Sequence, residues 1–226
     1  MTAPRQLVVA IDGPAGSGKS TIAAHLAKKL GYINLESGAM YRALALKVLE
    51  QQVSLDDPEA LRLLAEKTAI QLEPQSEGNR VLLDGRDVSQ RIREADVTAA
   101  ASRVSVYPQV REIMVARQRE LGARGGVVMD GRDIGTAVFP KADVKVFLDA
   151  DARIRAERRV AQNGTHTPEE AKRIIEDLVA RDQRDRTRAV SPLVPASDAV
   201  ILDTTNLSID EVVLRVEQLI RQRLSR

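Results

Sequence analysis

The sequence predicts an α/β fold in which a five-stranded parallel sheet carries helices on both faces. Five short apolar runs alternate with segments whose apolar residues recur at helical spacing, as in βαβ units. Each run is nearly continuous, which is typical of strands that are buried on both faces of a parallel sheet. The runs that we interpret as strands are residues 6–12, 32–35, 126–130, 144–149 and 199–203.

The first strand leads through a glycine-rich loop into a helix. Residues 21–30 place Ile22 and Leu26 on one helical face, and Gly31 provides a C-terminal stop signal. A second helix is expected over residues 38–52, after the second strand. The chain therefore opens with two strand–helix units.

Residues 69–88 interrupt this alternation. Two short strands at 69–73 and 80–84 flank a turn-like stretch at 76–79, which predicts a hairpin. Helical segments are expected on either side of the hairpin, at 57–68 and 90–105. The predicted division is a core of residues 1–42 and 101–226 and an inserted α+β lobe of about residues 43–100.

Two later helices have strong start signals. Thr167-Pro-Glu-Glu170 and Ser208-Ile-Asp-Glu211 both fit a capping box, and the first also has proline at the first helical position.

Size and composition exclude several classes of protein. At 226 residues the chain suits one core domain with insertions. It contains no cysteine, which excludes a disulfide framework, a zinc–thiolate site and a thiol nucleophile. No run resembles a secretory signal or is long enough to span a bilayer. We therefore expect a cytoplasmic protein without a membrane partner, and a monomer, because no apolar seam stands out.

The charge pattern argues against a general nucleic-acid surface. The net charge is only +2, aromatic residues make up 2% of the chain, and basic residues are interleaved with acidic ones. The isoelectric point near 9.0 is the single feature that favours such a surface. Of the 34 basic residues 26 are arginine, the preferred side chain for binding phosphate, although codon bias also explains many of them.

The segment from Gly13 to Ser20 matches the phosphate-loop pattern G-x-x-x-x-G-K-[ST] at every fixed position. In such a loop the backbone N–H groups and the N-terminus of the next helix bind phosphate, the lysine reaches the outer phosphates, and the hydroxyl binds Mg²⁺. A glycine turn that merely caps a helix is the alternative, and the strand–loop–helix context argues against it. The predicted residues for ATP are Gly13, Pro14, Ala15, Gly16, Ser17, Gly18, Lys19, Ser20 and Thr21, with Ser20 as the metal ligand.

Three classes of protein share this loop: signalling GTPases, ATPases that drive motion or assembly, and small-molecule kinases. The guanine-reading pattern Asn-Lys-x-Asp is absent, because none of the asparagines is followed by lysine. A GTPase is therefore disfavoured, while a kinase and a nucleic-acid-associated ATPase remain as alternatives.

Three clusters of arginine and aspartate favour the kinase. Residues 37–42 follow the second strand and 130–133 follow the third, so both are expected at the edge of the sheet that carries the phosphate loop. A third cluster extends a helix, where the spacing of Arg181, Asp185 and Arg188 places them on one face. A solvated, salt-bridged helix end is the alternative for this third cluster.

These motifs resemble those of the bacterial cytidylate kinases, in the P-loop nucleoside monophosphate kinase superfamily. The matching segments are the phosphate loop, Ser37-Gly-Ala-Met-Tyr-Arg42, Ala101-Ser-Arg-Val-Ser105 with Pro108-Gln-Val-Arg111, Asp130-Gly-Arg-Asp133-Ile-Gly-Thr, and Arg181 to Arg188 followed by Ala-Val-x-Pro-Leu. They occur in the same order over about residues 6–220, and the inserted lobe is included.

The resemblance implies an ATP- and Mg²⁺-dependent kinase that transfers the γ-phosphoryl group in line to CMP and dCMP. It implies a P-loop core, a lobe that binds the monophosphate, and a short lid at about residues 151–167. The catalytic residues would be Lys19, Arg42, Arg132 and Arg158. Arg42 and Arg132 would hold the acceptor phosphate, and Arg181 and Asp185 would face the ribose. The cytosine would be surrounded by Ser102, Arg111, Asp133 and Arg188, and Ser37 and Tyr41 would complete the acceptor site. Which lid arginine reaches the phosphates stays open among Arg153, Arg155, Arg158 and Arg159, and another nucleoside monophosphate remains the alternative acceptor.

The chemistry of such a transfer needs no general base, because a phosphate monoester loses its second proton near pH ~6. His25 and His166 lie outside every motif, in agreement with this. Asp133 would accept a hydrogen bond from the amino group of cytosine and repel the carbonyl of uracil. Asp12 and Asp130 either order Mg²⁺ through water or cap a loop.

Overall fold

The computed structural model describes residues 6–75, 78–162 and 167–224. At its centre is a five-stranded sheet of order β2-β6-β1-β7-β8, in which every neighbouring pair is parallel. The predicted fold class is confirmed, and each predicted run forms one strand. The strands are β1 (Val8–Asp12), β2 (Ile33–Glu36), β6 (Val127–Gly131), β7 (Val144–Asp149) and β8 (Val200–Asp203).

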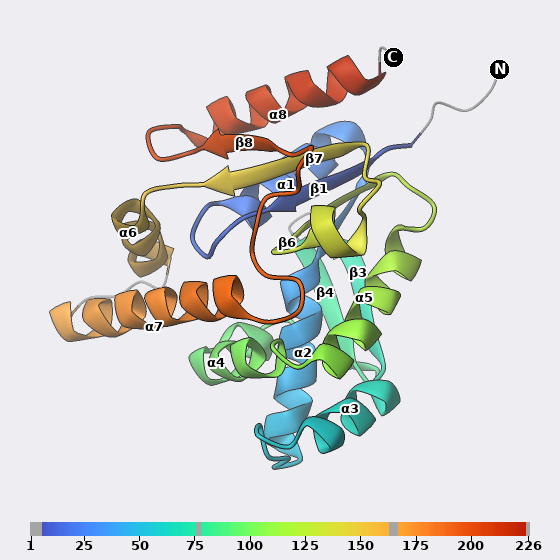
Figure 1. The fold of residues 1–226 in the computed structure, drawn as a ribbon, viewed down its shortest axis with the longest axis vertical. Helices are drawn as coiled ribbons and strands as arrows, with labels where there is room; N and C mark the ends of the chain where they lie inside the picture. Colours follow the sequence, from blue (N-terminus) through green and yellow to red (C-terminus); the bar gives the residue numbers. More distant parts are fainter. Residues whose placement is uncertain (1–5, 76–77, 163–166, 225–226) are drawn as a thin grey trace.

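The sheet separates two hydrophobic cores, as β1 illustrates. Val9 and Ile11 pack with two helices on one face, whereas Ala10 packs with the helix after β2 on the other. This alternation follows from the two-residue period of a strand. The first pair of helices is α1 (Lys19–Leu30) and α8 (Ile209–Leu224), and the third helix is α2 (Ser37–Glu50). Figure 1 shows α8 on one side of the sheet and α2 extending away from it on the other.

A second, antiparallel sheet lies beside α2 and confirms the predicted hairpin (Figure 1). It consists of β3 (Ile70–Gln75), β4 (Gly78–Leu83) and the short β5 (Arg86–Asp87), and residues 76–77 of the predicted turn lie outside the described residues. Three further helices pack against α2: α3 (Pro58–Lys67), α4 (Ala95–Val104) and α5 (Pro108–Gly122).

The prediction of a single helix over residues 90–105 is wrong. The chain instead forms a short 3₁₀ turn η1 (Arg91–Arg93), and α4 starts afresh after it. Glu94 separates the two because its backbone is extended, with ψ of 156°, and cannot continue helical hydrogen bonding. The borders predicted for the inserted lobe fall inside α2 and α4, so the division stays a prediction.

Two further helices precede β8. They are α6 (Ala152–Gln162) and α7 (Pro168–Thr187), and residues 163–166 of the predicted lid lie outside the described residues. The capping signals are confirmed: the Thr167 side chain accepts from the Glu170 N–H at 3.3 Å, and Ser208 and Glu211 bond reciprocally. Within the described ranges, none of the helices is long and apolar enough to cross a membrane.

The register brings three loops to one edge of the sheet. Asp12 at the end of β1 is opposite Gly131 of β6, and Glu36 at the end of β2 is opposite Asp130. The phosphate loop, the start of α2 and the segment after β6 therefore leave the sheet side by side, where ligands of open α/β sheets bind.

Candidate active site

The phosphate loop connects β1 to α1. Its first residue must be glycine: Gly13 has a φ of 149°, and a Cβ there would lie 2.0 Å from the carbonyl oxygen of Leu148. Lys19 is buried inside the loop and donates to the carbonyl of Pro14 at 2.6 Å and to the Ser17 hydroxyl at 3.4 Å. Burial, reinforced by the charge of Arg132, lowers the pKa of Lys19 well below its ordinary value. An anion bound beside the ammonium group would therefore compensate its charge.

Ser20 and Asp130 form a corner that suits a metal ion. The Ser20 hydroxyl donates to Asp130 Oδ2 at 2.7 Å. The other carboxylate oxygen, Asp130 Oδ1, is buried and has no hydrogen-bond partner among the described residues. Burial raises the pKa of Asp130 to about 6, and the nearby Glu36 charge adds to the effect. A hydroxyl and a carboxylate are oxygen ligands of the kind that Mg²⁺ prefers.

Asp12 has a different role from Asp130. Its two carboxylate oxygens accept from the backbone N–H groups of Ile134 and Gly135 at 2.8 and 2.7 Å. It therefore caps the helical turn η2 (Ile134–Val138), which is one of the two roles that the sequence left open. Burial raises the pKa of Asp12 to about 6 in spite of these two hydrogen bonds.

Two arginines expected at the acceptor phosphate lie at this edge, and each is held by a carboxylate. Arg42 pairs with Glu36, and its Nε is buried without a partner among the described residues. Burial opposes ionisation of Glu36, but the Arg42 charge holds the pKa of Glu36 below its ordinary value. Arg132 donates through Nε to Asp185 at 2.8 Å. Ser37 lies between these groups and donates to the Asp130 carbonyl at 2.7 Å.

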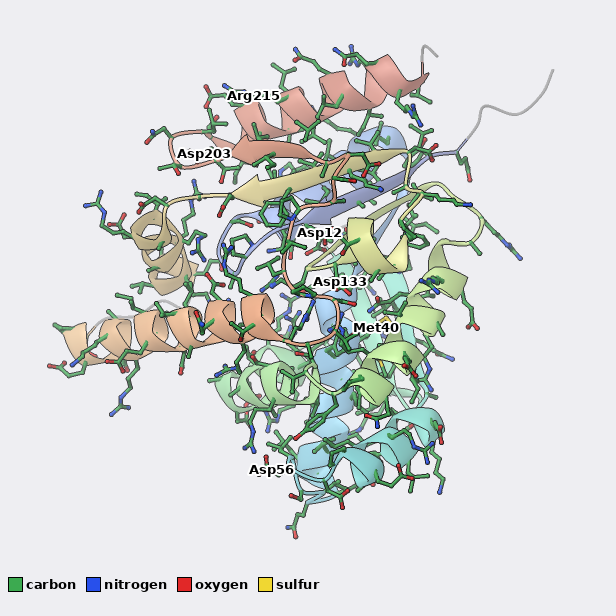
Figure 2. The ribbon with its side chains drawn as sticks, in the orientation of Figure 1. Asp12, Met40, Asp56, Asp133, Asp203 and Arg215 are labelled. Atoms are coloured by element: carbon green, nitrogen blue, oxygen red, sulfur yellow. The ribbon has the colours of Figure 1, made fainter. Side chains whose placement is uncertain are left out.

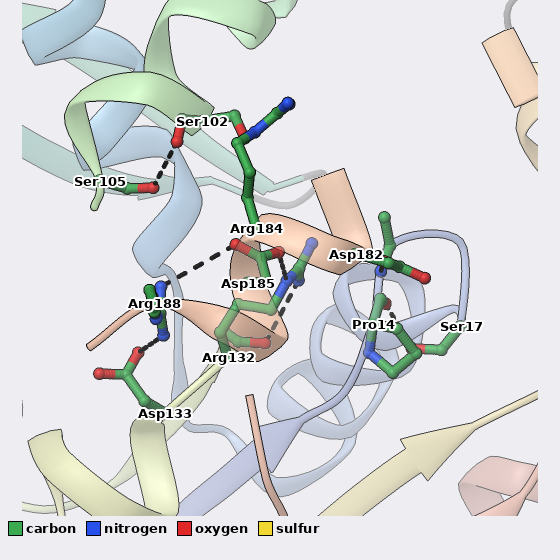
Figure 3. A network of polar contacts seen from close by, with 12 residues as sticks. Pro14, Ser17, Ser102, Ser105, Arg132, Asp133, Asp182, Arg184, Asp185 and Arg188 are labelled. Atoms are coloured by element: carbon green, nitrogen blue, oxygen red, sulfur yellow. Dashed lines mark hydrogen bonds and ion pairs between the residues drawn. The ribbon is translucent and has the colours of Figure 1, made fainter. Parts of the chain in front are cut away.

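Three residues expected around the cytosine form a buried chain of alternating charge with Asp185, which was expected at the ribose. Asp133 pairs with Arg111 on α5 and, at 3.4 Å, with Arg188, which in turn lies 3.9 Å from Asp185. All four side chains are buried, so the solvated helix end that was the alternative for the third cluster is wrong for Asp185 and Arg188. Figure 3 shows Asp133 and Arg188 facing each other, with Asp185 beside Arg132. Figure 2 places Asp133 close to Asp12, in the interior of the molecule.

Tyr41 and Arg181 complete the walls of this region. The guanidinium carbon of Arg111 lies 5.6 Å from the centroid of the Tyr41 ring, within cation–π range. The Tyr41 hydroxyl is buried without a partner among the described residues, and burial raises its pKa to about 12. Burial and the charge of Arg132 lower the pKa of Arg181 to about 9.

The structure separates the four arginines of the predicted lid. Arg153 is 81% exposed and faces Glu157, whereas Arg155 is buried against the phosphate loop. Arg158 donates to the carbonyl of Thr204 at 2.7 Å. Burial and the Arg42 charge lower the pKa of Arg159, which places Arg159 within electrostatic range of the acceptor arginine.

A cavity of about 560 Å³ lies beside the phosphate loop. The sequence did not predict the residues after β8 that line it. It includes the Arg158 side chain and apolar groups on both sides, among them Ile22, Leu207 and Val212. Leu207 and Val212 lie after β8 and carry no motif; only the expected position of β8 in the sheet could have indicated them. A larger hollow of about 730 Å³ lies on the inserted lobe, where Arg80 and Arg91 are already paired with carboxylates.

Arg184 is a second residue that sequence analysis missed. Its Nε donates to the Ser102 hydroxyl at 3.0 Å and so links α7 to α4 (Figure 3). The residue lies within the quoted arginine cluster, and its spacing of i+3 from Arg181 and i−4 from Arg188 places it on the same helical face, so the periodicity could have indicated it. His25 is exposed on α1 and lies outside the site, as expected. His166 lies outside the described residues.

Comparisons with known proteins identify the family of the chain. Residues 9–222 match the family model described as cytidylate kinase. The chain is 49% identical over 217 residues to the cytidylate kinase of Geobacillus sp. (strain WCH70), covering 96% of this chain and 97% of that protein. It is 49% identical over 221 residues to the cytidylate kinase of Enterococcus faecalis (strain ATCC 700802 / V583), with 96% and 97% coverage. The cytidylate kinase of Geobacillus kaustophilus (strain HTA426) is 47% identical, with 97% and 99% coverage. The chain belongs to the cytidylate kinase family.

Proposed function

We propose that this protein transfers the γ-phosphoryl group of ATP to CMP, giving CDP and ADP, and that it also accepts dCMP. Membership of the family supports the proposed reaction. One structural observation supports the roles that we assign to individual residues. The phosphate loop and the buried charge chain around Asp133 meet at the same edge of the sheet. A nucleoside triphosphate in the loop and a nucleoside monophosphate against the chain would therefore face each other.

The donor lies in the phosphate loop in this proposal. Backbone N–H groups of the loop and the N-terminus of α1 bind the phosphates, and Lys19 exchanges its contact with Pro14 for the outer phosphates. Ser20 and Asp130 hold Mg²⁺, since the unpartnered Asp130 Oδ1 offers a buried oxygen ligand. When bound, the ion would offset negative charge on the donor phosphates. The adenine occupies the 560 Å³ cavity, where apolar walls that include Ile22, Leu207 and Val212 suit a flat base.

The acceptor phosphate binds Arg42 and Arg132. Each guanidinium has five N–H donors, so it can keep its carboxylate partner and still bind a phosphate. The unpartnered Nε of Arg42 is such a donor. Arg158 is proposed as the catalytic lid arginine, because it lines the cavity beside the phosphate loop.

Cytosine is recognised by Asp133, with Ser102 and Arg111 beside it. Arg111 and Arg188 both pair with the Asp133 carboxylate and so orient its acceptor oxygens. An ionised carboxylate accepts from the amino group of cytosine and repels the carbonyl that uracil has at that position. Arg181 and Asp185 face the ribose in this proposal, and they decide how far dCMP is accepted.

The residues lower the barrier by compensating charge. The acceptor oxygen is ionised at neutral pH, so the difficulty is repulsion between two anionic phosphates. Lys19, Arg42 and Arg132 meet that charge from fixed positions, where each is worth about 2–4 kcal/mol of barrier. In this proposal the protein is cytoplasmic, acts on free nucleotides and is a monomer. Light scattering after size-exclusion chromatography measures its molar mass and so tests the monomeric state.

The test is an ADP-release assay with ATP and Mg²⁺ in which CMP, dCMP, UMP, AMP, GMP and dTMP are offered separately. We expect fast turnover with CMP and dCMP and much slower turnover with UMP. Asp133→Ala should lose the preference for CMP over UMP. Acceleration by none of the monophosphates would overturn the proposed function, and turnover stimulated by DNA or RNA would favour the ATPase alternative.

A further inference from the structure

Arg155 on α6 and Asp182 on α7 form a buried ion pair beside the phosphate loop. Both residues belong to the second half of the chain, yet both bind the backbone of Ala15. Arg155 Nη1 donates to the Ala15 carbonyl at 2.9 Å, and Asp182 Oδ1 accepts from the Ala15 N–H at 3.3 Å. Figure 3 shows Asp182 beside the loop that carries Pro14. The pair therefore holds one loop residue from both of its peptide groups.

Arg155 itself is fixed, in contrast to a mobile lid side chain. Its exposure is 6%, and its Nε donates to the Ala150 carbonyl at 3.0 Å, close to the end of β7. The backbone of Arg155 also packs against the loop, because a Cβ on Gly16 would lie 2.7 Å from the Arg155 carbonyl oxygen. The beginning of α6 is thus anchored to the loop by backbone and side chain together.

The two contacts fix the orientation of two consecutive peptide planes. In a trans peptide the C=O and the next N–H point in opposite directions. Because Asp182 holds the Ala15 N–H, the Pro14 carbonyl points the other way, and Lys19 Nζ binds it there at 2.6 Å. Because Arg155 holds the Ala15 carbonyl, the Gly16 N–H is directed away from α6. Backbone N–H groups so directed are what a phosphate loop offers its ligand.

Fold stability alone does not explain this pair. A buried ion pair returns little or no net stability compared with apolar residues of similar size, because desolvation offsets the attraction. An arginine and an aspartate do provide what apolar residues lack, a donor and an acceptor directed at one peptide unit. Glycine at position 16, with φ of 76°, leaves that unit free to rotate unless it is held.

We propose that Arg155 and Asp182 are a positioning pair that presets the phosphate loop for the donor nucleotide by fixing the peptides around Ala15. Arg155 is accordingly an anchor of the donor site, in contrast to Arg158 and Arg159, which remain the candidates for contact with the phosphates. The inference rests on the proposed function, since it assigns the pair to the ATP side of that reaction.

The test compares Arg155→Met, Arg155→Lys and the double variant Arg155→Met/Asp182→Asn with the parent protein. The double variant leaves no unpaired buried charge, so it should fold, as circular dichroism and thermal melting would show. The matched control is Lys172→Met/Glu176→Gln, which neutralises an exposed ion pair on α7. Affinity for ADP is measured by calorimetry, and KM is measured separately for ATP and for CMP.

We expect both methionine variants to bind ADP at least about tenfold more weakly and to raise the KM for ATP similarly, the loss that one charged hydrogen bond carries. The KM for CMP should change less than about twofold, Arg155→Lys should recover part of the loss, and the control should match the parent. Unchanged ADP affinity in a folded double variant would overturn the proposal. So would equal increases in both KM values, or a double variant that does not fold, because either result assigns the pair to the fold.

This design separates the inference from the proposed function. A parent protein that binds ADP but does not phosphorylate CMP would overturn the function, while the ADP affinities of the variants would still decide the role of the pair. A parent that phosphorylates CMP, with variants that keep the parent KM for ATP, would overturn the inference alone.

Discussion

The Ser20 hydroxyl donates a 2.7 Å hydrogen bond to Asp130 Oδ2, which joins the first turn of α1 to the end of β6. The second oxygen of the same carboxylate is buried without a partner among the described residues. The hydrogen bond orients the carboxylate, and in the proposed function the remaining oxygen is a ligand for Mg²⁺. This contact connects the phosphate loop with the segment that carries Arg132 and Asp133.

Replacing Asp130 with asparagine should weaken the response to Mg²⁺. The amide keeps an acceptor for Ser20 but loses the negative charge, so about 10–100-fold more Mg²⁺ should be needed for half-maximal rate. Initial rates over a Mg²⁺ titration at constant ATP check this. Asp143→Asn, at the opposite end of the sheet from the site, is the control for a general effect of removing an aspartate. An unchanged Mg²⁺ requirement in Asp130→Asn would exclude this residue from the metal site.

Replacing Arg42 with methionine should reduce kcat/KM for CMP by about 30–1000-fold, equivalent to the 2–4 kcal/mol that one preorganised donor contributes. The change removes a donor near the acceptor phosphate and leaves Glu36 without its partner. Steady-state kinetics with CMP varied at saturating ATP measures the loss. Arg62→Met is the control, since Arg62 pairs with carboxylates on the outer surface of α3. A kcat/KM within threefold of the parent would remove Arg42 from the site.

The sequence predicted the parallel sheet, and it predicted the phosphate loop between the first strand and its helix, because these depend on local patterns. Continuous apolar runs predict buried strands, and a phosphate loop between a strand and a helix fixes one corner of the site. The partners of the charged groups could not be predicted in the same way. Arg155 reaches Ala15 across 140 positions of the sequence, and Arg184 reaches Ser102 across 82.

The helix predicted over residues 90–105 shows a limit of a different kind. Its composition favours helix throughout, but the chain turns at Glu94, where an extended backbone separates η1 from α4. Arg91 pairs with Asp96 across this break, at 2.7 Å. Helical propensity does not encode such a contact, because tertiary packing decides where a helix of ordinary composition is interrupted.

Ionisation of Asp12 should make the free energy of unfolding of the protein depend on pH. The folded pKa of about 6 lies above the ordinary unfolded value near ~3.9, so the folded state binds more protons between these pH values. The contribution of Asp12 is therefore fully present below pH ~4 and is lost as the pH rises through ~6, by about 3 kcal/mol.

Denaturant unfolding of the parent and of Asp12→Asn at pH 4, 5, 6 and 7 isolates this effect. The parent should lose stability relative to the variant as the pH rises, because asparagine does not ionise. Carboxylates with lowered pKa values, such as Glu36 and Asp185, have the opposite slope, and they cancel in the difference because both proteins contain them. A difference that is constant from pH 4 to 7 would contradict the raised pKa of Asp12.

Replacing Arg184 with methionine should impair the acceptor side alone. Its Nε–H donates to the Ser102 hydroxyl, which leaves the hydroxyl proton of Ser102 available for another acceptor, such as the ring nitrogen or carbonyl of cytosine. Without Arg184 the hydroxyl is free to rotate, and the KM for CMP should rise about three- to tenfold, in keeping with one neutral hydrogen bond. The KM for ATP should stay within twofold of the parent. Arg186→Met is the control for loss of positive charge, because Arg186 is exposed on the same helix. An equal rise in KM for CMP in both variants would show that only the charge of α7 matters.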